Sequence, residues 1–300
     1  MDTNFKSGYV GIVGRPNVGK STILNKLVGQ KIAIISPKPQ TTRNKILGIM
    51  HGDGFQAVFL DTPGFHKPKT KLGENMVRSV NETIGDAELV MLVVEPTTEV
   101  HPAEMEIIDK LRGLPCILVI NKTDIVKKDE LLNIIMTYSK LYNFCAVVPV
   151  SARTKDNMDE LVSVIKEQLP PGPPYYPEDM VTDQQEKEIV AEIIREKMLK
   201  ILRDEIPHGT AVEIMKMKYS ETEKGDMFNI SANIFCEKNS HKGIIIGKGG
   251  KTLKEIGTSA RLDCERMLDA KVFLELWVKV KEDWRNSNNL MRELGIIETE

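Results

Sequence analysis

Short apolar runs alternate with longer amphipathic stretches throughout the first half of the chain. Stretches such as 21–29 and 129–142 mix polar and apolar residues in a pattern typical of helices. The runs that are typical of buried strands are residues 9–14, 55–61, 88–95, 116–122 and 146–152. This alternation predicts βα units around a mostly parallel sheet flanked by helices, with binding residues at the carboxyl ends of the strands.

The run LPPGPPYYPEDM at residues 169–180 interrupts this alternation. Its five prolines and one glycine cannot continue a helix or a central strand, so the run is typical of a linker. We therefore expect a first domain over 1–169, a linker over 170–182 and a second domain over 183–300.

The pattern after the linker is different. Apolar residues recur at helical spacing over 186–206, and strand-like runs follow at 210–219 and 227–237. A helix, a glycine-rich turn, a second helix and a strand at 271–280 come next, and a short helix ends the chain. This order predicts a separate α+β domain. We expect Trp277 and Trp284 to pack in its core or against the terminal helix.

The 41% hydrophobic and 28% charged content is typical of a globular protein. A chain of 300 residues is too long for one ordinary hydrophobic core, which favours two domains. The formal net charge of −2 gives no global indication of nucleic acid or anionic membrane. The four cysteines, Cys116, Cys145, Cys236 and Cys264, form no CxxC pair, and we expect reduced core thiols rather than zinc ligands. No signal segment or membrane-length apolar run is visible, which favours a cytoplasmic location.

A phosphate-binding pattern lies between the first strand and the first helix. Gly14 is followed by four residues and then by Gly19, Lys20 and Ser21. In this pattern backbone N–H groups face phosphate oxygens, the lysine reaches the β- and γ-phosphates, and the hydroxyl ligates Mg²⁺. The expected nucleotide contacts in this loop are Gly14, Arg15, Pro16, Asn17, Val18, Gly19, Lys20, Ser21 and Thr22.

A second motif, Asp61-Thr62-Pro63-Gly64, ends the strand at 55–61. The carboxylate can hold Mg²⁺ through water and the N–H of Gly64 can meet the γ-phosphate, although a lone motif of this kind is also an ordinary turn. Thr41 and Thr42 lie between the two motifs, and either could close on Mg²⁺. We favour Thr42, so that the expected metal ligands are Ser21, Thr42 and Asp61.

A third motif selects the base. Asp124 can accept hydrogen bonds from N1–H and the N2 amine of guanine together, whereas adenine presents a lone pair at N1. Lys122 can lie over the base plane, Asn121 can brace the loop, and the turn at 151–152 can offer a backbone N–H to O6. The expected base contacts are Asn121, Lys122, Thr123, Asp124, Ser151, Ala152 and Arg153.

No catalytic residue is assigned beyond Lys20 and Gly64, which support the γ-phosphate. Phe65 follows the second motif at a position where many small GTPases have a water-orienting glutamine. Arg15 and Arg43 are at least as well explained as solvent-facing charges as by a role as an arginine finger. Because neither a water-orienting glutamine nor an arginine finger can be assigned, we expect slow intrinsic hydrolysis of the bound nucleotide. Asn17 resembles the residue that coordinates a monovalent cation in potassium-activated GTPases, which makes K⁺ a candidate cofactor beside Mg²⁺.

The second glycine loop, GIIIGKGGKTLKEIG at 243–257, lacks the spacing and the hydroxyl residue of a phosphate loop. It is similar to the GxxG loop that joins two helices in KH domains and brings its backbone close to single-stranded RNA. Five lysines and no acidic residue lie between positions 238 and 254. A helix–helix turn with solvated lysines is the alternative. We expect bases to lie between the following helix and the strand at 227–235. The expected RNA contacts are Lys242, Ile246, Gly247, Lys248, Gly249, Gly250, Lys251 and Lys254.

Together, GRPNVGKST, QTTR, DTPGF, NKTD, VSAR and the second glycine loop resemble the Era family of bacterial GTPases over essentially the whole chain. The resemblance implies an α/β P-loop GTPase domain followed by a type II KH domain. It also implies a monomer that binds GTP or GDP and single-stranded RNA near the 3′ end of small-subunit ribosomal RNA. Assistance in assembly of the small (30S) subunit, GTP-dependent rearrangement of the domains, peripheral association with the cytoplasmic face of the membrane and a link to the cell cycle are further implications.

Two alternatives remain open at this point. One is a membrane-associated or cell-cycle GTPase whose C-terminal domain binds a protein. The other is a GTP-dependent RNA-modifying enzyme, but the C-terminal domain has no cysteine-histidine cluster, paired carboxylate motif or cofactor fingerprint.

Overall fold

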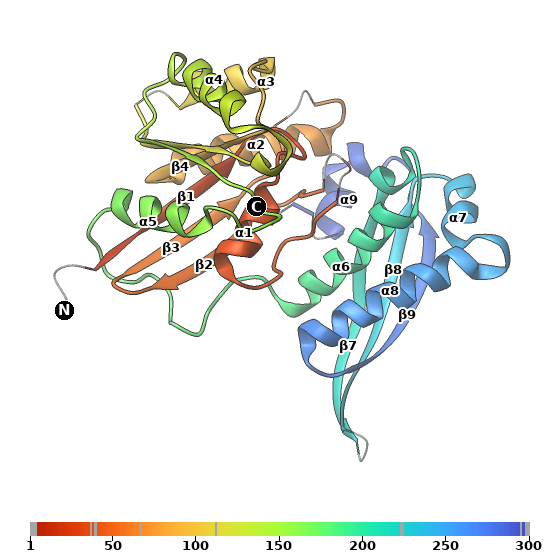
Figure 1. Ribbon diagram of the computed structural model, residues 1–300. Helices are drawn as coiled ribbons and strands as arrows, with labels where there is room; N and C mark the ends of the chain where they lie inside the picture. Colours follow the sequence, from red (N-terminus) through yellow and green to blue (C-terminus); the bar gives the residue numbers. More distant parts are fainter. Residues whose placement is uncertain are drawn as a thin grey trace. The chain divides into compact units, whose positions relative to one another are not determined.

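The computed structural model describes residues 5–36, 38, 41–65, 68–111, 113–222, 225–294 and 296–297. Contacts between Cα atoms divide the chain into two compact units, and Figure 1 labels the helices and strands of each. The first comprises residues 1–33, 42–68 and 73–183, and the second comprises 34–41, 69–72 and 184–300. Two short segments from the N-terminal half therefore cluster with the C-terminal unit.

The first unit contains a six-stranded sheet in the order β2-β3-β1-β4-β5-β6. Its strands are β1 (Lys6–Val13), β2 (Ile46–Gly52), β3 (Phe55–Asp61), β4 (Leu89–Val94), β5 (Cys116–Ile120) and β6 (Ala146–Pro149). The five predicted strands are present and parallel, as the pairings of β1 with β3 and β4, and of β5 with β4 and β6, establish.

The edge strand β2 was not among the five predicted strands, and it runs antiparallel to β3. Gly48 interrupts its apolar pattern because Leu24 of helix α1 and Ile32, which follows that helix, pack close above it. A Cβ atom at Gly48 would lie 2.7 Å from Ile32 Cδ1 and 2.8 Å from Leu24 Cδ1. The missing side chain hides a buried strand from a search for apolar runs.

Helices cover both faces of this sheet. α1 (Lys20–Val28) and α5 (Met158–Gln168) pack on one face, in a core that includes Ile12, Phe59 and Val119. α2 (Lys71–Asp86), α3 (Pro102–Lys110) and α4 (Lys128–Ser139) supply the core of the other face, around Leu92 and Leu118. The two separate cores confirm the predicted α/β architecture.

The proline-rich run is bonded to the first unit rather than lying free. Pro170 accepts a hydrogen bond from the backbone N–H of Ser7 at 3.1 Å, and Val181 accepts one from Ile49 at 2.8 Å. Between them, Gln56 Oε1 accepts from the N–H groups of Tyr175 and Tyr176 at 2.6 and 3.0 Å. The extended backbone of the run thus satisfies its polar groups on the sheet.

The second unit contains a three-stranded sheet in the order β7-β8-β9, with β7 antiparallel and β9 parallel to β8. Its elements are α6 (Glu186–Ile201), β7 (Thr210–Thr222), β8 (Gly225–Cys236), α7 (Asn239–Ile246), α8 (Lys251–Leu268), β9 (Lys271–Val280) and α9 (Asn288–Glu293). Helices α6, α7 and α8 cover one face of the sheet (Figure 1). The predicted order of elements is confirmed. The described residues of the two units also contain four 3-10 helices: Thr123–Ile125, Ile206–Gly209, Lys248–Gly250 and Trp284–Asn286.

Two expectations about individual side chains are wrong. Cys145 is exposed, because it immediately precedes the edge strand β6, whereas the other three thiols are buried as expected. Trp277 has 60% of its surface exposed, because it lies on the face of β9 that turns away from the helices. Trp284, in contrast, is fully buried as expected and donates its Nε1–H to the Gly209 carbonyl at 3.0 Å.

Within the described part of the chain, no helix combines the length and the apolar composition needed to cross a membrane.

Candidate functional site

The phosphate loop connects β1 to α1, and its two outer glycines cannot carry side chains. Gly14 has φ 150° and a Cβ there would lie 2.3 Å from the Val93 carbonyl oxygen. Gly19 has φ 103° and a Cβ there would lie 2.1 Å from Asn121 Nδ2. The loop is therefore curled against β4 and against residues 121–124, here called the base-binding loop because we predict that it contacts the base, with α1 beginning at Lys20.

Lys20 is buried at the foot of this loop. Its ammonium group donates to the carbonyl oxygens of Gly14 and Arg15 at 3.1 and 3.0 Å. Burial lowers the pKa of Lys20 to about 8, although nearby Asp61 opposes the shift. Burial likewise raises the pKa of Asp61 to about 6. Bound phosphates and a metal ion would supply the opposite charges that stabilise the charged forms of Lys20 and Asp61 in this buried site.

Three oxygen-bearing side chains meet next to Lys20. Ser21 Oγ donates to Asp61 Oδ2 at 2.7 Å and lies 2.9 Å from Thr42 Oγ1. The other carboxylate oxygen of Asp61 is buried and has no hydrogen-bond partner among the described residues. One carboxylate and two hydroxyls are hard oxygen ligands, so the group fits Mg²⁺ completed by phosphates and water.

The structure distinguishes the two candidate threonines. Thr42 is buried with its hydroxyl beside Ser21, whereas the hydroxyl of Thr41 donates to the Lys38 carbonyl at 2.6 Å. Thr42 is thus the better placed of the two, and its role as a metal ligand stays a prediction.

The second motif lies directly over the phosphate loop. Thr62 donates to the Ile12 carbonyl at 2.8 Å, and the N–H of Phe65 donates to the Gly14 carbonyl at 3.1 Å. A Cβ at Gly64 would lie 2.6 Å from the backbone of Pro16, which explains the glycine. Phe65 is buried in the core, so its side chain cannot orient water. His66 and Lys67, which follow this motif, lie outside the described residues, as do Pro37, Pro39 and Gln40, which precede the two threonines.

Neither nearby arginine faces solvent as the simpler interpretation held. Arg15 donates from Nε to Glu104 Oε1 at 2.6 Å and lies 3.4 Å from Glu95. Glu104 is fully buried and also accepts from Tyr138 at 2.7 Å. Arg43 is buried as well. Arg15 is thus anchored in the wall of the loop.

Glu95 also pairs with Lys122, so one acidic residue joins the phosphate loop to the base-binding loop. Sequence reasoning missed Glu95 and Glu104. The only local indication was the position of Glu104 in the first turn of α3, where it completes a capping box with His101.

Asn121 braces the base-binding loop, as expected. Its side chain donates to the Val18 carbonyl at 2.8 Å and accepts from the N–H of Ala152 at 3.1 Å. That N–H was a candidate donor to guanine O6, so a base at this position must share it with Asn121.

Asp124 is oriented by the neighbouring turn. Ser151 Oγ donates to Asp124 Oδ1 at 2.7 Å, and Arg153 lies 3.8 Å from Oδ2. The N–H of Thr123 donates to the Val150 carbonyl at 3.2 Å, and Lys122 has φ 63°. The loop therefore presents one fixed carboxylate.

The remaining predicted residues fall on the same loops. Val18 is buried, Asn17 is exposed with φ 67°, and Thr22 lies half-buried on the first turn of α1. Pro63 is buried between Asp61 and Gly64. The predicted nucleotide residues thus gather at the carboxyl ends of β1, β3, β5 and β6, where ligands bind in open α/β sheets.

The second glycine loop joins α7 to α8 in the second unit. Gly247, Gly249 and Gly250 have φ of 74°, 58° and 78°. A Cβ at Gly247 would lie 2.2 Å from Thr252 Oγ1, whereas nothing lies within 4 Å of a Cβ at Gly249 or Gly250. The loop is closed against its own helix on one side and open on the other.

Lysines surround the open side of this loop. Lys248, Lys251 and Lys254 are exposed, and Lys242 and Ile246 are half-buried. The arrangement brings cationic groups to a backbone that a sugar-phosphate chain can approach closely.

The base-binding groove expected between α8 and β8 stays a prediction. β8 is the central strand, paired on both edges, and α8 packs mainly on β9 and α6. The edge strand that contacts both α7 and α8 is β9, so β9 is the better placed border for such a groove. Pattern alone identified the strands but could not order them.

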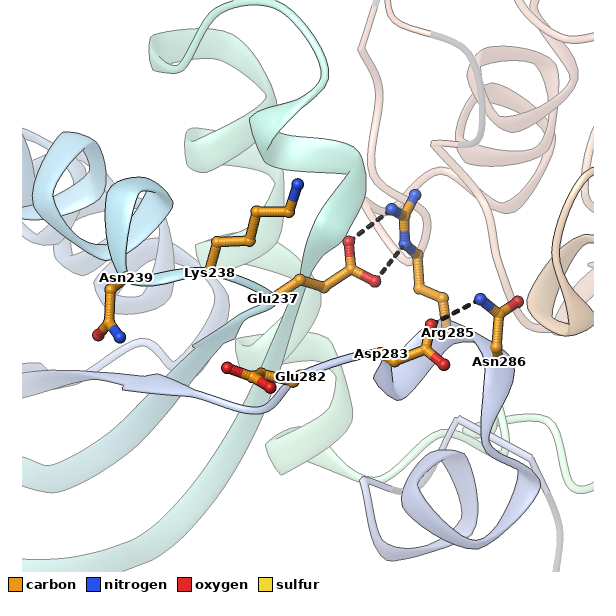
Figure 2. Close-up of a pocket in the computed structure, with 7 residues that line it drawn as sticks. All are labelled: Glu237, Lys238, Asn239, Glu282, Asp283, Arg285 and Asn286. Atoms are coloured by element: carbon orange, nitrogen blue, oxygen red, sulfur yellow. Dashed lines mark hydrogen bonds and ion pairs between the residues drawn. The ribbon is translucent and has the colours of Figure 1, made fainter.

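A separate hollow of about 490 Å³ lies in the second unit and is lined by polar side chains (Figure 2). Arg285 donates to Glu237 through Nε at 3.0 Å and Nη2 at 2.5 Å, and Asn286 donates to Asp283 at 2.7 Å. These bonds lie within the wall, and we assign no ligand to it.

Family models match both units. Residues 9–122 match the family described as 50S ribosome-binding GTPase, and residues 205–285 match the KH domain. The chain is 53% identical over 294 residues to GTPase Era of Ruminiclostridium cellulolyticum, covering 97% of this chain and 98% of that one. This chain belongs to the Era family of GTPases.

Solved Era structures agree over the whole length. A single-residue variant of Aquifex aeolicus Era bound to GDP·AlF₄⁻ superimposes with a TM-score of 0.93 and 40% identity, over 98% of this chain and 100% of that one. Another Era structure, in complex with MgGDPNP and nucleotides 1506–1542 of 16S ribosomal RNA, gives the same TM-score, identity and coverage. Membership confirms the expected pairing of a GTPase domain with a KH domain, and the chain is a GTPase.

Proposed function

We propose that this GTPase is a switch whose KH domain binds single-stranded RNA near the 3′ end of 16S ribosomal RNA and assists assembly of the small ribosomal subunit. The observation that carries the proposal is the open backbone of Gly249 and Gly250 beside exposed lysines. The Era relative that holds nucleotides 1506–1542 of 16S ribosomal RNA supports this choice of RNA. A cytoplasmic monomer fits such a role.

The nucleotide site contributes binding and orientation. Mg²⁺, when bound, offsets negative charge on the β- and γ-phosphates. Ser21, Thr42 and Asp61 would hold it, and Lys20 would contact the same phosphates. Because Phe65 is buried and Arg15 is anchored by Glu104, neither residue assists the attacking water. We therefore expect slow intrinsic hydrolysis.

K⁺ is a candidate for the missing positive charge. Asn17 lies exposed at the top of the phosphate loop with φ 67°, and its amide oxygen is a suitable ligand for a monovalent cation. Hydrolysis should then be faster in K⁺ than in Na⁺ at equal ionic strength, and Asn17→Ala should remove the difference. Equal rates in the two salts would reject this cofactor.

The switch itself is supported by contacts of residues 34–41 within the second unit. The N–H of Ile35 donates to Glu196 Oε1 at 3.1 Å, and Arg195 donates to the Thr41 carbonyl. Glu196 and Arg195 lie on α6. Thr42, which follows Thr41 in the chain, has its hydroxyl beside that of Ser21, another expected metal ligand. A γ-phosphate that fixes Thr42 would thereby act on a segment that α6 holds. If GTP favours RNA binding, RNA must tighten GTP by the same factor.

The RNA-binding proposal is tested by Gly249→Asp, which places a negative charge in the open side of the loop. Gly225→Asp is the matched control, because Gly225 also has a positive φ, 101°, with nothing within 4 Å of its Cβ position. Binding of the 16S fragment to each variant is measured by fluorescence anisotropy at two salt concentrations. We expect Gly249→Asp to abolish the salt-sensitive RNA binding and Gly225→Asp to retain it. Equal binding by both variants would leave the loop a turn and favour a protein-binding C-terminal domain.

The choice of subunit needs a separate experiment, because one matching family is described as 50S ribosome-binding. The wild-type chain with a GTP analogue should sediment with isolated 30S subunits and not with 50S subunits. Preference for 50S subunits would contradict the proposed assembly role. The same centrifugation with anionic vesicles tests the peripheral membrane association that family resemblance suggested.

A further inference from the structure

One face of the sheet in the second unit is covered by helices, and the opposite face, here called the outer face, is open in this unit. Apolar residues of the sheet such as Ile230, Ile234 and Val278 pack in the core under the helices. Along β9, residues alternate between the two faces, and Phe273, Glu275, Trp277 and Lys279 lie on the outer face. The outer face is therefore separate from the glycine loop and its groove.

Two aromatic rings are exposed on this outer face. Phe273 has 53% and Trp277 60% of its surface accessible, and among the described contacts neither ring stacks on another ring. They are four residues apart on one strand, about 13 Å at the usual rise, too far to stack on each other. Each ring thus presents a separate flat apolar surface, and exposed aromatic side chains of this kind mark interaction sites.

The strand register surrounds these rings with polar and cationic groups. Across the sheet, Phe273 aligns with Asn229 and Lys218, and Glu275 aligns with Ser231 and Lys216. Further along, Trp277 aligns with Asn233 and Glu213, whose side chains share a hydrogen bond of 3.4 Å. Around the two rings, Lys216, Lys218 and Lys279 thus stand against two carboxylates, those of Glu275 and Glu213. The charge balance favours an anionic partner.

We propose that the outer face is a second RNA-binding surface, on which single-stranded bases stack on Phe273 and Trp277 while Lys216, Lys218 and Lys279 contact phosphates. Base–aromatic stacking with flanking cations is the usual physics of single-strand binding on sheets. Glu275, between the rings, can accept hydrogen bonds from exocyclic amino groups of bases. This inference rests on the proposed RNA-binding function and extends it to nucleotides beyond those held at the loop.

Continuity between the two surfaces supports the assignment. β9 is an edge strand of the sheet, and it is also the strand nearest the α7–loop–α8 unit. A strand of RNA that leaves the loop has only the edge of β9 to cross before it reaches Phe273 and Trp277. A KH loop clamps about four nucleotides, so a longer RNA has nucleotides available for the second surface.

The test compares two RNA lengths on the full chain. The long probe is RNA corresponding to nucleotides 1506–1542 of 16S ribosomal RNA. The short probe is an RNA of about six nucleotides from the same region that carries the loop-binding segment. Trp277→Ala and Phe273→Ala are the variants, and Leu262→Ala on α8, whose side chain is 43% exposed, is the control. Affinity and tryptophan fluorescence are measured together, since stacking of a base on Trp277 quenches its emission.

We expect Trp277→Ala to weaken binding of the long probe by about 5- to 100-fold and to leave the short probe unchanged. The wild-type emission should be quenched by the long probe, and Trp277→Ala should lose that quenching. Thermal unfolding of each variant verifies that the fold is retained.

The proposal is overturned if Trp277→Ala binds the long probe as the wild type does, in which case a protein partner becomes the better occupant. An equal loss for both probes would also overturn it, because Trp277 would then act at the loop. If the wild-type chain binds neither probe, the RNA-binding function itself fails, and this inference fails with it.

Discussion

The hydroxyl oxygens of Thr42 and Ser21 lie 2.9 Å apart, and Ser21 also donates to Asp61 at 2.7 Å. The adjacent hydroxyl of Thr41 is instead bonded to the Lys38 carbonyl. Two neighbouring threonines with the same chemistry thus have different environments. We therefore predict that Thr42, and not Thr41, responds to a metal ion and a γ-phosphate.

Thr42→Ala should weaken binding of a GTP analogue in the presence of Mg²⁺ by about 5- to 30-fold, the equivalent of one lost polar interaction. GDP affinity should change little, because a switch threonine closes only on the triphosphate form. Thr41→Ala is the control and should behave as the wild type. Titration of a fluorescent analogue measures each affinity, and an identical loss for both nucleotides would refute the assignment.

Asp124→Asn should exchange guanine for xanthine specificity. The amide that replaces the carboxylate donates where guanine N2 also donates, whereas xanthine has a carbonyl at that position. We expect GTP affinity to fall by roughly 10³- to 10⁴-fold and the xanthine nucleotide to bind better than GTP. Competition binding measures the ratio. Asp129→Asn, an exposed change on α4, should leave the preference for guanine intact.

Glu104→Gln tests the anchor of the phosphate loop. The buried carboxylate accepts from Arg15 at 2.6 Å and from Tyr138 at 2.7 Å, so its neutralisation leaves the guanidinium with only the more exposed Glu95, at 3.4 Å, as an acidic partner. The free energy of unfolding should fall by about 2–4 kcal/mol. Glu106→Gln, exposed on the same helix, should change it by less than about 0.5 kcal/mol. Equal denaturation midpoints for the two variants would show that the anchor is dispensable.

Lys20→Met should stabilise the nucleotide-free protein while abolishing nucleotide binding. Burial depresses the pKa of Lys20 from 10.5 to about 8, which corresponds to a cost on the order of 3 kcal/mol at neutral pH. Because the unfolded chain binds more protons between these two pKa values, the wild type gains stability as the pH rises through that window. Thermal unfolding without nucleotide should therefore show a higher midpoint for Lys20→Met at pH 7 and a smaller difference above pH 8. A lower midpoint for the variant at pH 7 would contradict this.

Local patterns predicted most strands of the first unit because these strands are continuous apolar runs, and the residues that we predict to contact the nucleotide are grouped in short consecutive motifs. Gly14, Lys20, Asp61 and Asp124 can each be read from a short motif. Glu104 could not, since it lies on a helix distant in sequence and acts only through Arg15.

Features that depend on strand order or on packing were beyond the pattern. The apolar alternation of β9 identified a strand but did not reveal that Trp277 lies on its uncovered face. The pattern likewise could not show that β9, rather than β8, lies at the edge of the sheet. Gly48 concealed β2, because the space for its side chain is occupied by Leu24 of α1 and by Ile32.

Control of RNA binding by the nucleotide is tested most directly by the affinity of the 16S fragment in the presence of a non-hydrolysable GTP analogue and of GDP. We expect tighter RNA binding with the analogue than with GDP, and RNA should strengthen binding of the analogue relative to GDP by the same factor. The same RNA affinity with both nucleotides would contradict control by the nucleotide.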